Sequence, residues 1–518
     1  MKFIILTDGT ALIRPTSLMR NIKKSETFTS SEKMLAKLSD KAFLSLWSFA
    51  NVYTDEGLKV NDKGERKGQG EELCDLLVVF GNHVLIFSDK GQIEYRPKDD
   101  VKVSWRRWVE RAFLKSAYST YKAEKWIKEL PHRIFLDKEC TEKFPIAIPN
   151  KNIIKLHRIA VARGITEHSK KFYKDASGTL FIKPDIVGKE HYNQPFIIGT
   201  ADKKKGYVHF FDEESIDKLF NELDTIKDFT DYLTKKEELI NSGMLLVAPG
   251  EDELLGYYLS SREKEEYIHS PQFIMPEGRT NEVIAVQTGF YEGHRNTKAY
   301  KTLKEIARIS YFWDRCIEIM GSAAFTGRWH ETNGKNYDEE ITVLKYMASE
   351  SRMARSVLSD AFSEVSRKPF AASEVRPRVR VSGSPTNPEM VYVWLVMQLT
   401  SEQKDYAEYR EHRKAMISSY CMACKDAFPQ FKTIVGIASD AINNKGASEE
   451  LIYVHTDDWT DEEYKHAKWL REELGLLKNW KPAVNSFSLK NKESDLSKLR
   501  KRKKKTNKEQ KAARRKSR

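Results

Sequence analysis

The stretch GEELCDLLVVFGNHVLIFSDK contains two short apolar runs separated by a turn signal. Leu76 to Phe80 and Val84 to Phe87 are continuously apolar, which is typical of strands buried on both faces. Gly81-Asn82 between them favours a tight hairpin turn. The pattern predicts a buried β-hairpin in which Asp75 begins the first strand and Lys90 follows the second.

Helical patterns lie on both sides of this hairpin. Ser30 and Ser31 precede Glu32 and an apolar spacing that predicts an N-capped helix. The aromatic-rich run from Phe43 to Tyr53 then predicts a strand. After the hairpin, residues 99–129 predict one long amphipathic helix. The residues spaced for its buried face are Trp105, Trp108, Ala112, Ala123 and Trp126.

The rest of the chain divides by composition and periodicity. We expect a mixed α+β and α/β protein, with a mixed sheet flanked by helices at the N-terminus, a helical middle and a small C-terminal α/β unit. The predicted segments are a first domain over 1–130, an α+β continuation over 131–240, a mainly helical region over 241–368, the α/β unit over 369–481 and a disordered basic tail over 482–518. Arg352 and Arg355 are expected on an exposed helix face.

Length and composition narrow the class of protein. A chain of 518 residues with 40% hydrophobic content predicts two or three folded domains. Five cysteines form no disulfide framework, so we expect a reducing, cytoplasmic compartment. The chain has no apolar run of 18 residues and its N-terminus does not resemble a signal peptide, which predicts no membrane association.

The net charge of +13 is concentrated in the tail. Arg500 to Arg518 contains twelve Lys or Arg residues and one Glu, or +11, which leaves about +2 for everything else. Basic runs of this kind bind polyanions without sequence preference, so Arg500, Lys501 and Arg502 are candidate nucleic-acid contacts. A solubilising tail is the alternative. The exposed side of the 99–129 helix adds further candidates, which are Arg106, Arg107, Lys115 and Lys122.

The order helix, strand, hairpin, helix resembles the core of the PD-(D/E)xK, or restriction-endonuclease-like, nuclease superfamily over residues 28–130. The resemblance implies that Glu32 corresponds to the family's acid on the opening helix. It also implies that Asp75 corresponds to the acid on the first core strand. Ser88-Asp89-Lys90 matches the acid-x-lysine motif, with serine in place of the acid. The segment LDTIKDFTDYLTKKE also resembles one in bacterial proteins that carry such N-terminal parts.

The resemblance implies hydrolysis of phosphodiester bonds with Mg²⁺ or Mn²⁺. Asp75 would be the main metal ligand and Lys90 would position the attacking water. Side chains alternate along a strand, so Asp89 points away from Lys90 unless a bulge re-aims it. Three possibilities therefore remain for the second carboxylate. A bulge re-aims Asp89 as a metal ligand, or Glu32 or Glu72 supplies the carboxylate, or the site lacks it.

Two functions remain open at this point. The first is a metal-dependent DNA endonuclease with a role in bacterial defence or DNA processing. The second is a degenerate nuclease fold that binds nucleic acid or serves as a scaffold. In either case the protein acts alone, as a homo-oligomer or with an accessory subunit. The sequence assigns no chemistry elsewhere. His209 near Asp212 is interpreted as structural, and Cys421 and Cys424 as buried residues of a helix face rather than a zinc site.

Overall fold

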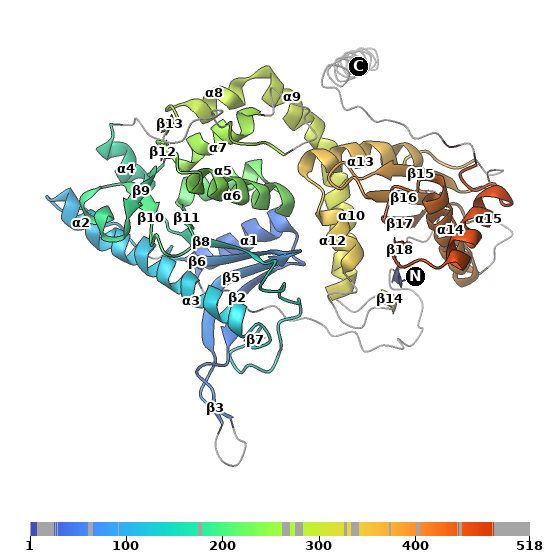
Figure 1. Cartoon of the computed structure of the whole chain (residues 1–518), viewed down its shortest axis with the longest axis horizontal. Coiled ribbons are helices and arrows are strands. Elements are labelled where there is room, and N and C mark those ends of the chain that lie inside the picture. Colours follow the sequence, from blue (N-terminus) through green and yellow to red (C-terminus); the bar gives the residue numbers. More distant parts are fainter. Residues whose placement is uncertain are drawn as a thin grey trace, which may run out of the picture.

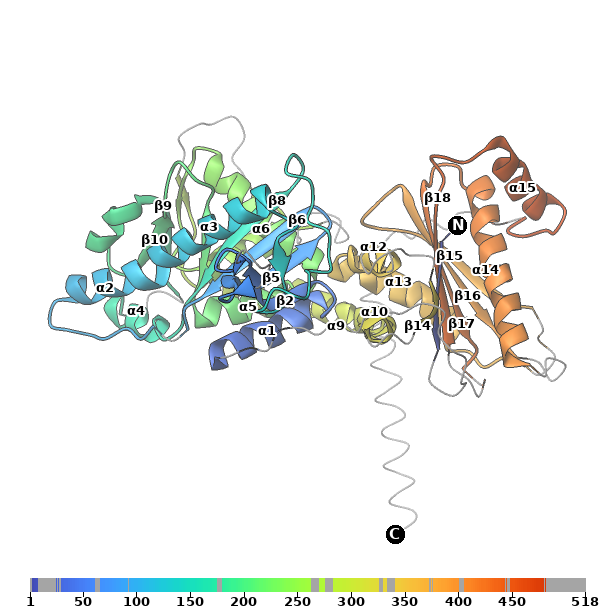
Figure 2. The ribbon, with the colours of Figure 1, turned by 90° about the horizontal axis from the view of Figure 1, so that it is seen from below.

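The computed structural model of the chain contains two six-stranded sheets with a layer of helices between them (Figures 1 and 2). It describes residues 2–7, 25, 27, 29–60, 66–91, 93–174, 179–261, 270–274, 283–325, 329–332, 341–371, 374, 376–399, 405–442, 444, 448–478 and 480. The predicted basic tail, with Arg500, Lys501 and Arg502, lies outside the described residues.

The first sheet has the order β11-β8-β6-β5-β2-β7. Its strands are Val208–Phe211 (β11), Lys155–Val161 (β8), His83–Asp89 (β6), Glu71–Phe80 (β5), Ser48–Thr54 (β2) and Ile134–Phe135 (β7). β5 and β6 form the antiparallel hairpin that the sequence predicts, whereas β6, β8 and β11 run parallel. The predicted strand over Phe43 to Tyr53 starts later, because Phe43 still belongs to a helix.

Helices cover both faces of this mixed sheet (Figure 1). One face carries α1 (Ser30–Phe43), α5 (Glu213–Glu222) and α6 (Ile226–Asn241). The other carries α2 (Val101–Val109), the π-helical turn η1 (Glu110–Leu114) and α3 (Lys115–Glu129), which together are the predicted long helix. Its predicted inner face is buried, except that Trp126 is only half-buried. The mixed sheet flanked by helices agrees with the predicted fold class.

Shorter elements extend from this core. The paired short strands are β3 (Lys59–Val60) with β4 (Arg66–Lys67), β9 (Phe181–Val187) with β10 (Ile197–Thr200), and β12 (Leu245–Val247) with β13 (Val283–Ala285). The helices are α4 (Thr166–Phe172), η2 (Gly188–Asn193), α7 (Glu251–Ser260), α8 (Phe290–Asn296), α9 (Lys298–Ala307), η4 (Arg308–Ser310), α10 (Tyr311–Phe325), α12 (Thr342–Ala348) and α13 (Arg352–Ser366).

The second sheet has the order β14-β1-β18-β17-β16-β15. Its strands are Trp329–Thr332 (β14), Lys2–Thr7 (β1), Ser448–His455 (β18), Thr433–Asp440 (β17), Met390–Met397 (β16) and Arg378–Gly383 (β15). α14 (Tyr406–Ala427) and α15 (Asp461–Glu472) cover its outer face (Figure 2). Cys421 and Cys424 are buried on α14 in this core, as their predicted packing role requires.

The N-terminal strand corrects the predicted first domain over 1–130. β1 pairs with β18 from Lys2–Tyr453 to Thr7–Ser448 and has no place in the first sheet. A short strand pairs with whichever sheet edge lacks a partner, and sequence distance does not restrict that choice. The C-terminal α/β unit therefore includes residues from the beginning of the chain.

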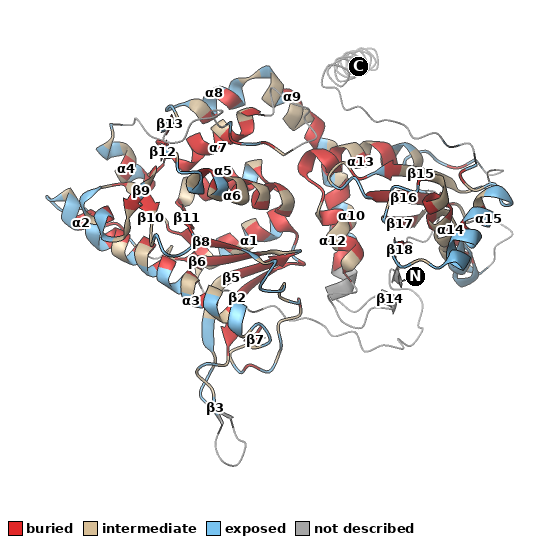
Figure 3. Ribbon diagram, viewed as in Figure 1, coloured by how far each residue is buried: buried red, intermediate tan, exposed pale blue. Residues whose placement is uncertain are grey.

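Buried ion pairs hold α13 to α10 and to the connection between α5 and α6, which corrects the expectation for Arg352 and Arg355. The Arg352 guanidinium lies 2.8 Å from Asp224 and 2.7 Å from Asp314, and Arg355 lies 2.6 Å from the other oxygen of Asp314. Both arginines are buried. They are structural because their charges are matched inside the protein, away from solvent and phosphate. Figure 3 shows this buried layer between the sheets.

Candidate active site on the hairpin

Asp75 and Lys90 line the same small cavity at the end of the β5–β6 hairpin. The paired register of β5 and β6 ends at Leu76 and Phe87, and the next residues, Asp75 and Ser88, both line this cavity. Ser88 and Lys90 then share this face, because side chains alternate along a strand. The cavity has a volume of about 150 Å³ and lies under α3; its polar lining residues are Glu72, Asp75, Ser88, Lys90, Ser119 and Thr120.

The Asp75 carboxylate is held by the neighbouring strand. The backbone N–H of Asp89 donates a 2.6 Å hydrogen bond to its Oδ2 atom. Burial raises the pKa of Asp75 to about 7, and Glu72 adds to that increase, whereas the Lys90 ammonium and the Asp89 N–H oppose it. A cation placed between the two carboxylates would offset the repulsion between Asp75 and Glu72.

Asp89 does not contribute its side chain to this cavity, in contrast to its predicted role as catalytic residue and metal ligand. Its carboxylate lies on the α1 face, where the Ser31 hydroxyl donates to it at 2.6 and 2.8 Å and the Gly91 N–H donates at 2.8 Å. No register shift interrupts β6. Gly91 passes so close to Ser31 that a Cβ would lie 2.0 Å from its Oγ. The Asp89 side chain therefore links the end of β6 to the first turn of α1.

Glu32 also lies on the α1 face, away from the cavity. Its carboxylate accepts from the Thr29 N–H at 3.3 Å and from the Asn51 amide at 3.4 Å. Thr29 is the N-cap of α1, and its hydroxyl accepts from the Glu32 N–H, so the two residues form a capping box. The resemblance to the family assigned Glu32 to the active site, but here it closes the first turn of the helix.

Glu72 supplies the second carboxylate of the cavity because β5 contains a bulge. Val52 pairs with Cys74 and Tyr53 with Glu72, so Leu73 is an extra residue on β5. In a regular strand Glu72 and Asp75 would face opposite sides of the sheet. The extra residue re-aims Glu72, and both carboxylates line the cavity. The bulge lies in the first strand of the hairpin rather than in the second.

The basic residues of the long helix that are predicted to contact nucleic acid differ in whether an acidic side chain already pairs with them. Arg106, Arg107 and Lys115 are exposed on the outer side of the long helix. Lys122 is exposed too, but Glu56 at 2.9 Å and Glu71 at 3.0 Å already match its charge. At 1.5 Å per residue, Arg106 lies roughly 20 Å along the helix from Ser119 at the cavity. Arg106 and Arg107 are therefore placed for remote backbone contacts rather than for the reacting phosphate.

The donor set of the cavity fits a hard divalent cation. Asp75 and Glu72 offer carboxylate oxygens in one cavity, and Mg²⁺ is commonly held by one or two carboxylates with water and substrate phosphate completing its octahedron. Mn²⁺ accepts the same ligands. Asp89 and Glu32 are not part of this donor set, because their carboxylates bind α1 and the strand end.

Sequence reasoning missed a second polar cluster on the same sheet. His157, His209 and Glu237 converge in the structure, and only His209 drew attention in the sequence. Asp212, its apparent neighbour, instead caps α5 by accepting from the Ser215 N–H at 2.8 Å. The sequence did contain one signal for this cluster, a histidine on each of two predicted strands. These strands, which carry His157 and His209, are parallel and adjacent in the structure.

Comparison with known proteins adds no relative. In the part of the chain that the structure describes, no helix has the length and apolar character needed to cross a bilayer. No protein-family model, curated protein or solved structure matches this chain.

Proposed function

We propose that this protein is a divalent-metal-dependent nuclease that hydrolyses phosphodiester bonds of nucleic acid, with DNA as the expected substrate. The observation that carries the proposal is the cavity that Asp75, Glu72 and Lys90 line together, where the charges of Glu72 and Lys90 both act on the Asp75 carboxyl. This is the combination of groups that phosphodiester hydrolysis with Mg²⁺ requires.

Each residue has a separate task in this proposal. Asp75 and Glu72 would hold the ion, whose chemistry is to polarise the phosphate and lower the pKa of bound water. The Asp89 N–H fixes Oδ2 of Asp75, so the carboxylate is oriented before substrate binds. The Lys90 backbone N–H donates to the Val161 carbonyl at 2.7 Å, which anchors the lysine beside Asp75. Its ammonium then orients the attacking water and stabilises charge that develops on the phosphoryl oxygens.

The long helix that covers the cavity carries exposed basic residues suited to a polyanion. Arg106, Arg107 and Lys115 project from this helix, and the sequence from Arg500 to Arg518 carries a further charge of +11. These charges favour phosphate backbones without regard to base sequence. A backbone-bound strand would lie along α2 and α3, with one phosphate at Lys90.

The test is digestion of supercoiled plasmid, linear duplex and single-stranded DNA and RNA with Mg²⁺ or Mn²⁺. We expect cleavage by the wild type and a loss of about 100-fold or more in Asp75→Ala and Lys90→Ala. Lys98→Ala and Asp99→Ala remove one exposed charge each outside the cavity and serve as matched controls.

Two results would refute this assignment. One is a wild type that never cleaves any of these substrates, and the other is undiminished cleavage by both cavity variants. A wild type that binds DNA tightly without cleaving it would favour the degenerate binding protein, for which the specific observation is that Ser88, and not an acid, lines the cavity.

A further inference from the structure

Two histidines and a glutamate meet on the face of the first sheet that α6 covers. His157 lies on β8, His209 on β11 and Glu237 on α6. Glu237 Oε1 lies 2.9 Å from His157 Nδ1 and 2.9 Å from His209 Nε2. One donor atom from each residue falls within 4.8 Å of the others, and among the described residues no other three His, Cys, Asp or Glu side chains converge in this way.

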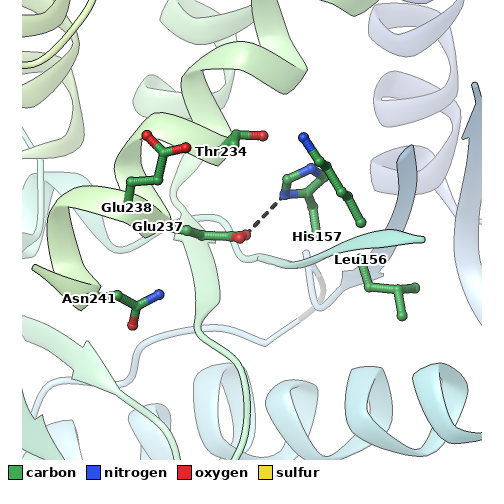
Figure 4. A pocket seen from close by; sticks show the side chains of 7 residues that line it. Leu156, His157, Thr234, Glu237, Glu238 and Asn241 are labelled. Atoms are coloured by element: carbon green, nitrogen blue, oxygen red, sulfur yellow. Dashed lines mark hydrogen bonds and ion pairs between the residues drawn. The ribbon is translucent and has the colours of Figure 1, made fainter. Parts of the chain in front are cut away.

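The parallel register brings these side chains together. β8 and β11 are adjacent, and His209 pairs with Ile159, two residues beyond His157. Residues two apart on a strand share a face, so both imidazoles point toward α6. Glu237 lies one turn after the buried Leu233 on that helix and points toward His157, as Figure 4 shows.

His83 on β6 orients the first of these ligands. Its Nδ1 lies 2.9 Å from His157 Nε2, and the two rings stack with centroids 5.2 Å apart. A histidine that binds a metal through one nitrogen usually has its other nitrogen held by such a partner. If His157 donates from Nε2 to His83, its Nδ1 presents a lone pair to the cluster.

The cluster is buried on the protein side and accessible from one direction. His157 and His209 are 1% and 0% exposed, whereas the Glu237 side chain is 24% exposed. Glu237 and His157 line a pocket of about 490 Å³ together with Lys155, Thr234, Glu238 and Asn241 (Figure 4). An ion can therefore reach the carboxylate from solvent, while the two imidazoles are fixed by the sheet.

We propose that His157 Nδ1, His209 Nε2 and Glu237 Oε1 bind one divalent transition-metal ion of the zinc class, with a fourth coordination position that opens into this pocket. Imidazole and carboxylate donors suit Zn²⁺, and three protein ligands with one free position are typical of sites that hold a water molecule or a substrate oxygen. Tetrahedral bonds of about 2.0–2.1 Å place donor atoms roughly 3.3 Å apart, so the two 2.9 Å contacts would open by a few tenths of an ångström.

This site is separate from the hairpin cavity and does not rest on the proposed nuclease activity. His157 is level with Leu85 of β6, and His209 is level with Phe87 through Ile159, so these ligands lie roughly 10–17 Å from Lys90 along that strand. The two sites also lie on opposite faces, one under α3 and the other under α6. A failure of one proposal therefore leaves the other intact.

The test is titration of the full-length, chelator-stripped protein with Co²⁺, monitored by visible absorption, followed by displacement with Zn²⁺. We expect one equivalent with the visible bands of tetrahedral Co²⁺ in the wild type, and Asp75→Ala, which removes the main ligand of the hairpin cavity, should keep this signal. His209→Gln and Glu237→Gln should each weaken binding by about 100-fold or more, and His83→Gln by about 10- to 100-fold. Glu238→Gln is the matched control, because it removes a neighbouring pocket carboxylate outside the cluster and should leave binding unchanged.

X-ray absorption of the Zn²⁺-loaded wild type provides a measurement that does not depend on how the variants fold. We expect nitrogen and oxygen donors that include two imidazoles. The proposal is wrong if the wild type binds no stoichiometric ion, if His209→Gln and Glu237→Gln titrate like the wild type, or if the absorption spectrum requires a sulfur ligand.

Discussion

The backbone N–H of Asp89 donates a hydrogen bond of 2.6 Å to Oδ2 of Asp75, whereas the Asp89 side chain points to the opposite face of the sheet. Asp89 thus makes hydrogen bonds on both faces of the sheet. Its peptide group orients the candidate catalytic carboxylate, and its side chain fastens the strand end to α1.

Asp89→Ala should therefore destabilise the protein without removing its activity. The substitution leaves the Ser31 hydroxyl and the Gly91 N–H without their buried acceptor, which costs about 1–3 kcal/mol of unfolding free energy. The Asp89 N–H remains, so cleavage per folded molecule should stay close to that of the wild type. Urea unfolding and digestion assays measure the two effects, and an inactive but fully stable variant would contradict this assignment.

Glu72→Gln should lower cleavage and raise the Mg²⁺ concentration needed for half-maximal rate. Glu72 shares the cavity with Asp75, and its loss leaves one carboxylate for the ion. We expect an effect of about 10- to 100-fold at limiting Mg²⁺. Glu71→Gln is the control, because Glu71 pairs with Lys122 instead. Equal Mg²⁺ curves for the two variants would remove Glu72 from the site.

His191 should make the unfolding free energy fall in acid. The buried imidazole donates from Nδ1 to the Gly188 carbonyl at 2.6 Å and accepts from the Gly199 N–H at 2.9 Å, so protonation would break the second bond. Burial lowers the pKa of His191 below its unfolded value of about 6.5. The unfolded chain binds more protons below that pH, so this contribution is complete above pH 6.5 and is lost as the pH falls.

The measurement is urea unfolding between pH 8 and pH 5. His191→Gln should show a shallower decline with falling pH than the wild type, and the exposed His132→Gln should match the wild type. A His191→Gln slope equal to that of the wild type would show that this imidazole is protonated in the folded state.

Arg352→Met should strongly destabilise the contact of α13 with α10 and with the connection between α5 and α6. The substitution removes the partner of the Asp224 carboxylate and one partner of Asp314, both buried. Breaking one side of a buried ion pair costs about 3–5 kcal/mol of unfolding free energy. Arg315→Met is the control, since Arg315 makes only an exposed pair with Glu318 on α10. Calorimetry should show a large decrease in melting temperature for the first variant alone, and equal melting temperatures would be inconsistent with a structural role.

Local pattern was enough to predict the hairpin, the long tryptophan-bearing helix and the position of Lys90 directly after β6, whereas Asp75, predicted to begin its strand, lies inside β5 (Glu71–Phe80). These features depend on alternation along a strand and on helical spacing, which act over a few residues. Alternation alone also predicts that Asp89 faces away from Lys90, and its carboxylate does lie on the α1 face.

Only the tertiary structure decided which carboxylate joins Asp75 and where a second metal-binding cluster forms. Glu72 is re-aimed by a bulge that exists because β5 pairs with β2, and β1 finds its partner in β18 at the other end of the chain. His157, His209 and Glu237 converge because two strands lie parallel under α6. Such pairings are selected by long-range packing, so no window of sequence contains both partners.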